Sequence, residues 1–133
     1  DRHGVDAQCL LTLATTTRDG RPITGPVDGV FFRGAFHFGS SPTSLRFRHL
    51  AARPAVSATH LPGEQFAVSV HGVAQRVDVD AAEHAELRQT LLDLYLPRYG
   101  DDWLDVLDGA AYARIDAHRL FAFWMPDEVA AAG

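Results

Sequence analysis

Short apolar and β-branched stretches, separated by turn residues, fill the first half of the chain. Stretches of this kind cover residues 9–17, 23–32, 35–39, 55–60 and 65–78. Alternating or β-branched apolar residues over such lengths are typical of strands, and Gly, Asp and Pro between them favour tight turns. The pattern predicts five strands. Their connections are so short that neighbouring strands are expected to run antiparallel.

The second predicted strand contains residues that rarely occupy a strand interior. Gly25, Pro26 and Gly29 all fall within it. Because proline lacks a backbone N–H and glycine lacks a side chain, these residues predict either a bulge or a close approach of the backbone to another group. Gly72 predicts a bend in the fifth strand for the same reason.

Two stretches of the chain are predicted to be helices. Residues 43–52 predict a short helix that ends before Pro54. Residues 80–96 repeat apolar side chains at helical spacing, with Asp80 as the expected N-cap and Pro97 as the expected end.

The remainder of the chain predicts a second short helix and further strands. Residues 101–107 form that helix, and residues 111–115 and 120–124 form two closing strands, separated by a polar break. Six to seven short strands in 133 residues predict one mainly β domain, residues 1–133. An antiparallel barrel is favoured because closure removes exposed strand edges.

Composition narrows the classes of function. The formal net charge of -5 argues against binding to nucleic acid or to an anionic membrane surface. No apolar run approaches the ~20 residues of a membrane span, and no stretch has the pattern of a secretory signal. The single cysteine, Cys9, fits a reducing cytoplasm and is expected to be a buried apolar residue.

A cluster of hydroxyl and basic side chains follows the third strand and enters the short helix. Ser40, Ser41, Ser44, Arg46 and Arg48 lie within nine positions of one another. Hydroxyl groups and backbone N–H groups at a helix start, beside fixed positive charge, suit a phosphate group. The residues by themselves equally fit an ordinary serine N-cap with solvated arginines.

The seven histidines are scattered along the chain. None forms a helical i, i+4 pair, and one cysteine does not complete a common metal site. Structural or surface roles are therefore expected, although His37 and His71 lie on predicted strands and could face a barrel interior or a cofactor.

Four segments together resemble the pyridoxamine 5'-phosphate oxidase-like superfamily, the FMN-binding split β-barrels, which include F420 (deazaflavin)-dependent relatives. The match begins with Leu13-Ala14-Thr15 and the turn Asp19-Gly20-Arg21-Pro22. It continues with residues 25–30, with residues 38–56, and with residues 68–74. The resemblance implies a split barrel working as a homodimer, with a cofactor groove between the subunits.

The resemblance also assigns roles to residues of this chain. It implies that the cofactor phosphate is held by the segment from the end of the third strand into the helix, and that the ring lies along the second strand. The phosphate residues carried over are Ser40, Ser41, Ser44, Leu45, Arg46 and Arg48, and the ring residues are Val27, Asp28 and Gly29. Trp124 is either a core or interface residue or one that reaches the partner's cofactor groove.

The function implied is hydride transfer between F420 or FMN and a small organic substrate, with the cofactor supplying the chemistry. Residues 24–26 lack the basic residue with which FMN-binding relatives enter the second strand. All twelve basic residues are arginine, which fits a GC-rich actinobacterial genome. Both features favour F420 over FMN. The alternatives are a non-catalytic cofactor carrier or sensor, a haem-handling split barrel, and a dimer with an empty groove.

Overall fold

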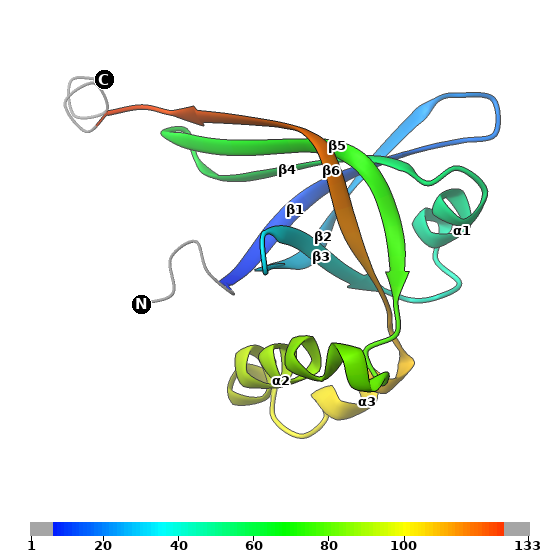
Figure 1. Ribbon diagram of the computed structural model, residues 1–133, viewed down its shortest axis with the longest axis vertical. Coiled ribbons are helices and arrows are strands. Elements are labelled where there is room, and N and C mark those ends of the chain that lie inside the picture. Colours follow the sequence, from blue (N-terminus) through cyan, green and yellow to red (C-terminus); the bar gives the residue numbers. More distant parts are fainter. Residues whose placement is uncertain (1–6, 127–133) are drawn as a thin grey trace.

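A closed barrel of six strands forms the body of the protein (Figure 1). This computed structural model describes residues 7–126. Neighbouring strands are antiparallel and follow the order β1-β2-β3-β6-β5-β4 around the barrel. The strands are β1 (Ala7–Thr16), β2 (Pro22–Phe32), β3 (Ala35–Ser40), β4 (Ala55–Gly63), β5 (Phe66–Val77) and β6 (Ala111–Trp124). The mainly β, antiparallel barrel predicted from the sequence is confirmed.

The helices cover two separate parts of the barrel. α1 (Leu45–Ala52) connects β3 to β4 and lies beside the barrel in Figure 1. A short 3-10 turn (Ala82–His84) leads into α2 (Ala85–Tyr99), which is followed by α3 (Trp103–Gly109); together α2 and α3 lie below the barrel in that view. Among the described residues, no helix has the length and apolar character needed to cross a membrane.

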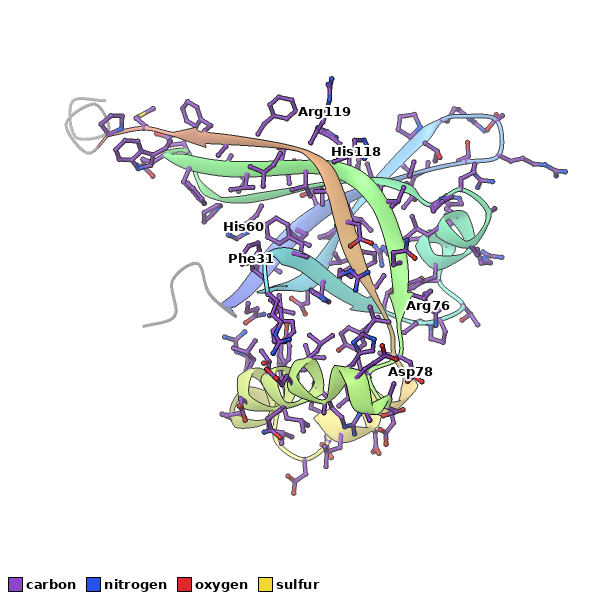
Figure 2. All side chains as sticks on the ribbon, in the orientation of Figure 1. Phe31, His60, Arg76, Asp78, His118 and Arg119 are labelled. Atoms are coloured by element: carbon purple, nitrogen blue, oxygen red, sulfur yellow. The ribbon has the colours of Figure 1, made fainter. Side chains whose placement is uncertain are left out.

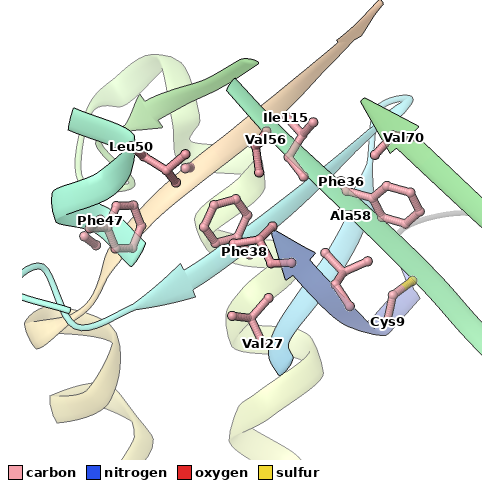
Figure 3. Packing of buried hydrophobic residues seen from close by; sticks show 14 residues of the cluster. Cys9, Val27, Phe36, Phe38, Phe47, Leu50, Val56, Ala58, Val70 and Ile115 are labelled. Atoms are coloured by element: carbon pink, nitrogen blue, oxygen red, sulfur yellow. The ribbon is translucent and has the colours of Figure 1, made fainter. Parts of the chain in front are cut away.

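The barrel interior is filled by apolar side chains from every strand (Figure 3). Alternate residues of β1, namely Cys9, Leu11 and Leu13, point inward, as the period of a strand requires. The expectation that Cys9 is a buried apolar residue is confirmed. α1 closes one side of this core by adding Phe47, whose ring stacks on Phe38 at a centroid distance of 5.7 Å.

A second core lies between the outer face of the barrel and the helices α2 and α3. Val30 and Phe32 of β2 pack there against Leu87 and Leu91 of α2. These are the strand residues that alternate with the inward-facing ones, so β2 is buried on both faces at this point. Helices that cover one outer face of the sheet therefore create a second apolar layer beside the barrel core.

Of the two alternatives predicted for β2, the structure supports the close approach. The register of β1 on β2 runs from Ala7 opposite Phe31 to Thr16 opposite Pro22 without a shift, so the predicted bulge is wrong. A Cβ placed on Gly29 would lie 2.7 Å from Leu11 Cδ1, well inside van der Waals contact. Glycine at this position therefore lets the Leu11 side chain pack directly on the backbone of β2.

The limits predicted for the long helix are wrong at both ends. Asp80 does not cap it: its carboxylate accepts a hydrogen bond from Arg88 at 2.7 Å, and α2 begins only at Ala85. Pro97 lies inside the last turn, where a proline removes only one hydrogen bond of the helix. The helix ends at Tyr99: the N–H of the capping residue Gly100 still donates to the Leu96 carbonyl, and its positive φ of 76° then turns the chain out of the helix.

The predicted pair of closing strands is in fact one strand, β6. It pairs with β5 along its whole length, with one register shift where Gly72 faces Ala117 and His71 faces Arg119. The extra residue forms a bulge, which accommodates the polar residues of this region without ending the strand. The bend predicted at Gly72 is confirmed. The predicted turn after His60 is shifted as well, because β4 continues to Gly63.

Candidate functional site

The segment after β3 turns sharply into α1. Ser41 Oγ accepts a hydrogen bond from the backbone N–H of Thr43 at 3.3 Å, and Ser44 Oγ accepts one from Phe47 N–H at 3.3 Å. Ser44 has extended backbone (φ -63°, ψ 155°), as a helix N-cap requires. Within residues 7–126, the N–H groups of Leu45 and Arg46 have no acceptor. The start of α1 therefore presents two free donors beside a serine hydroxyl.

Arg46 links three elements at this corner. Its Nη1 donates to Ser40 Oγ at 3.0 Å, and its Nη2 lies 3.4 Å from the Pro26 carbonyl oxygen. A Cβ on Gly25 would lie 3.2 Å from Nη2, so the absence of a side chain leaves room for the guanidinium. The positive charge of Arg46 is therefore held between the end of β3, the middle of β2 and the start of α1.

The structure describes a small recess beside this guanidinium, with a volume of about 160 Å³. Ser44, Leu45 and Arg46 line it from the helix, and Thr24 and Gly25 line it from β2. We call the recess and these residues the phosphate corner. It holds one guanidinium, a hydroxyl and the helix start, which are the groups that an anionic oxygen requires.

The other residues predicted for phosphate binding take different positions. Ser40 lies at the corner through its bond to Arg46, and Ser41 is exposed at the turn. Arg48 is exposed, and at two positions from Arg46 it faces another side of α1. The structure thus brings Ser40, Ser44, Leu45 and Arg46 together and leaves Arg48 on the adjoining surface.

His49 closes the inner end of the recess. Its side chain is 7% exposed, and its Nδ1 forms a hydrogen bond with Thr15 Oγ1 of β1 at 2.9 Å. Arg76 of β5 lies on the same side of the barrel (Figure 2) and covers the ring of Phe47 at 5.0 Å from its centroid. These contacts attach α1 to the barrel and fix the corner in place.

The residues predicted along the cofactor ring occupy both faces of β2. Val27 points into the barrel core, and Asp28 points outward. Asp28 Oδ1 lies 3.5 Å from Gln8 Nε2 of β1. Only backbone atoms of Val27 are left to meet a ligand on the outer face, whereas the Asp28 carboxylate is directly available there.

A large pocket opens beside this outer face and has a volume of about 670 Å³. Its floor is formed by β2 and β3, and its opposite wall by α2 and α3. Ser40 and Ser41 line one end of it, so the pocket adjoins the phosphate corner. Gly39 forms part of the floor: a Cβ there would lie 2.6 Å from Tyr112 Cε2, so the tyrosine ring lies flat on the strand.

Sequence reasoning missed most of the side chains that line this pocket. Tyr95 and Trp103 stack at a centroid distance of 4.9 Å, and Tyr95 also stacks on Tyr99 at 6.1 Å. From the sequence, Tyr95 is only one apolar position of a helix. The spacing of Tyr95, Tyr99 and Trp103 was the available signal, because aromatic residues so close in the sequence often share a surface.

His37 also lines the pocket and is 5% exposed. Burial lowers the pKa of His37 below the usual histidine value, with a smaller opposite effect from its bond to the Ala35 carbonyl at 3.1 Å. A carbonyl oxygen only accepts, so Nδ1 carries the proton and Nε2 of the neutral ring is an acceptor. Within residues 7–126, no group of three His, Cys, Asp or Glu side chains is arranged to hold a metal ion.

Trp124 lies far from the corner of its own chain. β6 begins with Ala111 opposite Ser40, and Trp124 follows 13 residues later at the other end of the strand. At about 3.3 Å per residue, the strand between the two positions is about 40 Å long at most. Trp124 is 68% exposed and is paired with Phe66 of β5. It therefore does not contribute to the site of its own protomer.

Comparisons with known proteins place the fold. No protein-family model and no curated protein match this chain. A conserved hypothetical protein from Mycobacterium tuberculosis is similar in structure, with 22% identity and a TM-score of 0.70 over 90% of this chain and 79% of that one. The haem storage protein HutZ from Vibrio cholerae has 21% identity and a TM-score of 0.71, covering 87% of each chain.

A third similar structure is an F420 reductase, with 18% identity and a TM-score of 0.61 over 85% of this chain and 89% of that one. At these identities the likeness concerns the fold. The chain has the split-barrel fold of pyridoxamine 5'-phosphate oxidase-like proteins, and the resemblance read from the sequence is confirmed at that level. Proteins of this fold include both haem proteins and deazaflavin reductases, so the site has to distinguish between them.

Proposed function

We propose that this chain is an oxidoreductase that binds a flavin-type cofactor, F420 or FMN, and transfers hydride between that cofactor and a small organic substrate. The observation that carries the proposal is the phosphate corner. There Arg46 is held by Ser40 and the Pro26 carbonyl, next to the free N–H groups that begin α1. The structural likeness to an F420 reductase supports it.

The residues present fit a phosphate group. The recess beside Arg46 is lined by the Ser44 hydroxyl and by Gly25, where a side chain would crowd the guanidinium. A phosphate oxygen there would accept from Arg46 and from the N–H groups of the first helical turn, and charge-assisted bonds of this kind are the strong ones. Ser41 and Arg48 are exposed and do not line the recess, so Arg46 is the arginine available to the phosphate there.

The large pocket continues from this corner along β2, past Asp28 and Gly29. A ring joined to a phosphate held at the corner would lie against this strand. When bound, a flavin or deazaflavin supplies a ring atom that gives or accepts hydride. The contributions of the chain are to bind the phosphate, to orient the ring along the backbone of residues 27–29, and to exclude water with the helices that cover the outer face.

The β2 wall of the corner favours F420 over FMN in this proposal. Thr24 and Gly25 line the recess, and Arg46 is the one arginine that lines it within the described chain. A phosphate monoester such as that of FMN carries nearly two negative charges at pH 7 and benefits from a second cation. A phosphodiester carries one charge, which Arg46 alone balances.

We also propose that the functional unit is a homodimer. Beyond the bulge at Gly72, the ends of β4, β5 and β6 extend past the barrel as a ribbon (Figure 1), and His118 and Arg119 lie where this ribbon leaves it (Figure 2). We call this extension the arm. Its exposed large apolar side chains are Leu61, Phe66, Leu120, Phe121, Phe123 and Trp124.

Apolar side chains on both faces of such a ribbon are costly in water, and contiguous patches of this kind mark interaction surfaces. A second copy of the chain is the proposed occupant, because one chain cannot bring Trp124 to its own corner. In a symmetric pair the arm of one protomer would lie along the barrel of its partner. Trp124 would then approach the partner's pocket.

The test is a pair of fluorescence titrations of the purified protein, one with F420 and one with FMN. Saturable binding of either cofactor supports the proposal, and tighter binding of F420 supports the preference. Tighter binding of FMN would overturn the interpretation of the β2 wall. Binding of neither would overturn the cofactor assignment. A parallel titration with haemin examines the haem function known for HutZ; preferential haemin binding would count against a flavin-type cofactor.

Turnover separates an enzyme from a carrier. Reduced cofactor is mixed with the protein and a panel of conjugated carbonyl and nitro compounds, and cofactor oxidation is followed by absorbance. Oxidation that depends on both the protein and the organic compound supports the oxidoreductase. Tight cofactor binding without any oxidation across the panel would instead support a non-catalytic carrier or sensor.

A further inference from the structure

Two tyrosine hydroxyl groups in the large pocket have no hydrogen-bond partner. Tyr95 of α2 is 5% exposed and Tyr112 of β6 is 8% exposed, and both line the pocket. Within residues 7–126, neither hydroxyl forms a hydrogen bond. Among the same residues, every side-chain oxygen that is fully enclosed has a hydrogen-bond partner. Each hydroxyl must therefore reach accessible space, and the pocket that both residues line provides it. Each phenol therefore offers a hydrogen-bond donor to a ligand that enters the pocket.

Both phenols are neutral donors under ordinary conditions. Burial, with a smaller contribution from the Asp28 carboxylate, raises the pKa of Tyr112 to about 12. Burial likewise raises the pKa of Tyr95, with Asp28 again contributing. Asp28 lines the same pocket as the two tyrosines, so the pocket offers a carboxylate acceptor as well as two phenol donors.

The helical wall of the pocket is aromatic, and among the described residues the lining carries no fixed positive charge. Tyr99, Tyr95 and Trp103 stack in succession along the helical wall, with interplanar angles of 17° and 21°. Within the described residues no arginine lines the pocket, whereas the carboxylates of Asp28 and Asp102 do. A flat ligand gains from stacking on such a wall. An anionic ligand is repelled by the two carboxylates.

We infer that this pocket binds a planar, uncharged conjugated molecule that carries a carbonyl- or nitro-type oxygen, and that Tyr95 and Tyr112 donate hydrogen bonds to that oxygen. A donor group elsewhere on the ligand would meet Asp28 or Nε2 of His37. That this molecule is the substrate of the enzyme rests on the proposed function. Binding of such a molecule in the pocket requires no cofactor.

The test uses three probes of similar shape and no cofactor. They are 2-acetylnaphthalene, which has a carbonyl oxygen, 2-ethylnaphthalene, which lacks it, and 2-naphthoate, which is anionic. Binding is followed by tryptophan fluorescence, since Trp103 lines the pocket. We expect the ketone to bind more tightly than the hydrocarbon and the anion. Tyr95→Phe and Tyr112→Phe should each weaken the ketone about two- to tenfold, the range for one neutral hydrogen bond.

Matched variants show whether the change in ketone affinity is specific to the hydroxyl groups of Tyr95 and Tyr112. Arg18→Ala, in the exposed turn between β1 and β2 and outside the pocket lining, should leave the ketone affinity unchanged. Asp28→Asn should strengthen naphthoate binding, because it removes a repelling charge. The Phe variants remove only an oxygen, and circular dichroism and urea unfolding confirm that each remains folded.

Two results would overturn the inference. One is equal binding of the three probes to the unaltered protein, or an unchanged ketone affinity in both Phe variants. The other is an unchanged ketone affinity together with weakened F420 or FMN binding in those variants, which would show that the two phenols contact the cofactor and not the organic ligand. Because the probe titrations contain no cofactor, a failure of the proposed function appears only in the cofactor titrations and is read separately.

Discussion

The backbone of Gly72 lies directly against the carbonyl group of Asp116 across the β5–β6 pair. A Cβ built on Gly72 would be 2.1 Å from the Asp116 oxygen and 2.8 Å from Ala117 Cα. The contact occurs at the bulge where the register of the two strands shifts. Here the barrel ends and the arm begins, so this glycine is required for the shape from which the proposed dimer is built.

Gly72→Ala should therefore destabilise the protein by about 1–3 kcal/mol, because the methyl group would meet backbone atoms that have little freedom to move. Urea unfolding followed by circular dichroism measures the change. The matched control is Gly109→Ala in α3, where a Cβ meets nothing within 4 Å. If both substitutions had the same small effect, the close contact at Gly72 would be disproved.

Arg46→Ala should weaken cofactor binding by about 1.5–3 kcal/mol, or roughly ten- to a hundredfold, since it removes a charge-assisted contact to phosphate. The dissociation constant is obtained by the fluorescence titration described above. Arg46→Lys should retain part of the affinity, because it keeps the charge but loses the planar two-point geometry. Arg18→Ala, in the exposed turn between β1 and β2, is the control and should bind normally. An unaltered dissociation constant for Arg46→Ala would refute the phosphate assignment.

Acid should destabilise the fold through His37. Burial depresses the pKa of this histidine in the folded state. The nearby Arg114 and His84 lower the pKa further, whereas Asp116 and the bond to the Ala35 carbonyl raise it. The unfolded chain therefore binds the proton more readily. The contribution of the neutral His37 to the free energy of unfolding is fully present above the ordinary histidine pKa of about 6.5. It is lost as the pH falls through the lower pKa of the folded state.

The free energy of unfolding, measured in urea at pH 7.5 and pH 5.0, should thus decrease at the lower pH. His37→Asn should reduce that decrease, because asparagine keeps a donor near the Ala35 carbonyl but does not titrate. His118→Asn, at an exposed position of β6, should leave it unaltered. An identical pH dependence in His37→Asn and in the unaltered protein would show that this histidine is not responsible.

Polar substitutions in the arm should separate the proposed dimer. Phe121 is 56% and Trp124 is 68% exposed in the single chain, and both would be covered by the partner. Phe121→Ser combined with Trp124→Ser should shift the mass measured by light scattering from dimer to monomer. The variant loses the apolar contacts of the interface and would have to bury two serine hydroxyl groups there. Val106→Ser, which alters a similarly exposed side chain on α3, is the control and should leave the mass unchanged. A monomeric unaltered protein would refute the dimer.

Local signals in the sequence predicted most of the elements correctly. The apolar and β-branched residues 9–17 predicted β1, because such side chains favour a strand, and the structure adds that Cys9, Leu11 and Leu13 form its buried face. Ser44 marked the start of α1, since its hydroxyl accepts from the first turn. Ser40, Ser44 and Arg46 lie together at that start because they are close in the chain, and their role in binding phosphate stays a prediction.

Predictions failed where a distant partner competed with a local preference. Asp80 has the spacing of an N-cap, yet its carboxylate binds Arg88, and the helix begins later. The polar residues 116–119 predicted a break, yet continuous pairing with β5 keeps them in one strand. In both cases the contact that decides the structure involves a residue outside the local pattern.

The sequence by itself determined the strand and helix periods, the turn after β3 and the hydroxyl and arginine groups that begin α1, because those features depend on neighbouring residues. Only the tertiary structure decided the large pocket. Tyr95 and Tyr112 belong to a helix and a strand separated by α3, and they face Asp28 of β2 only because α2 and α3 fold back over the outer face of the barrel. Packing of the second apolar core enforces that arrangement, and no local pattern encodes it.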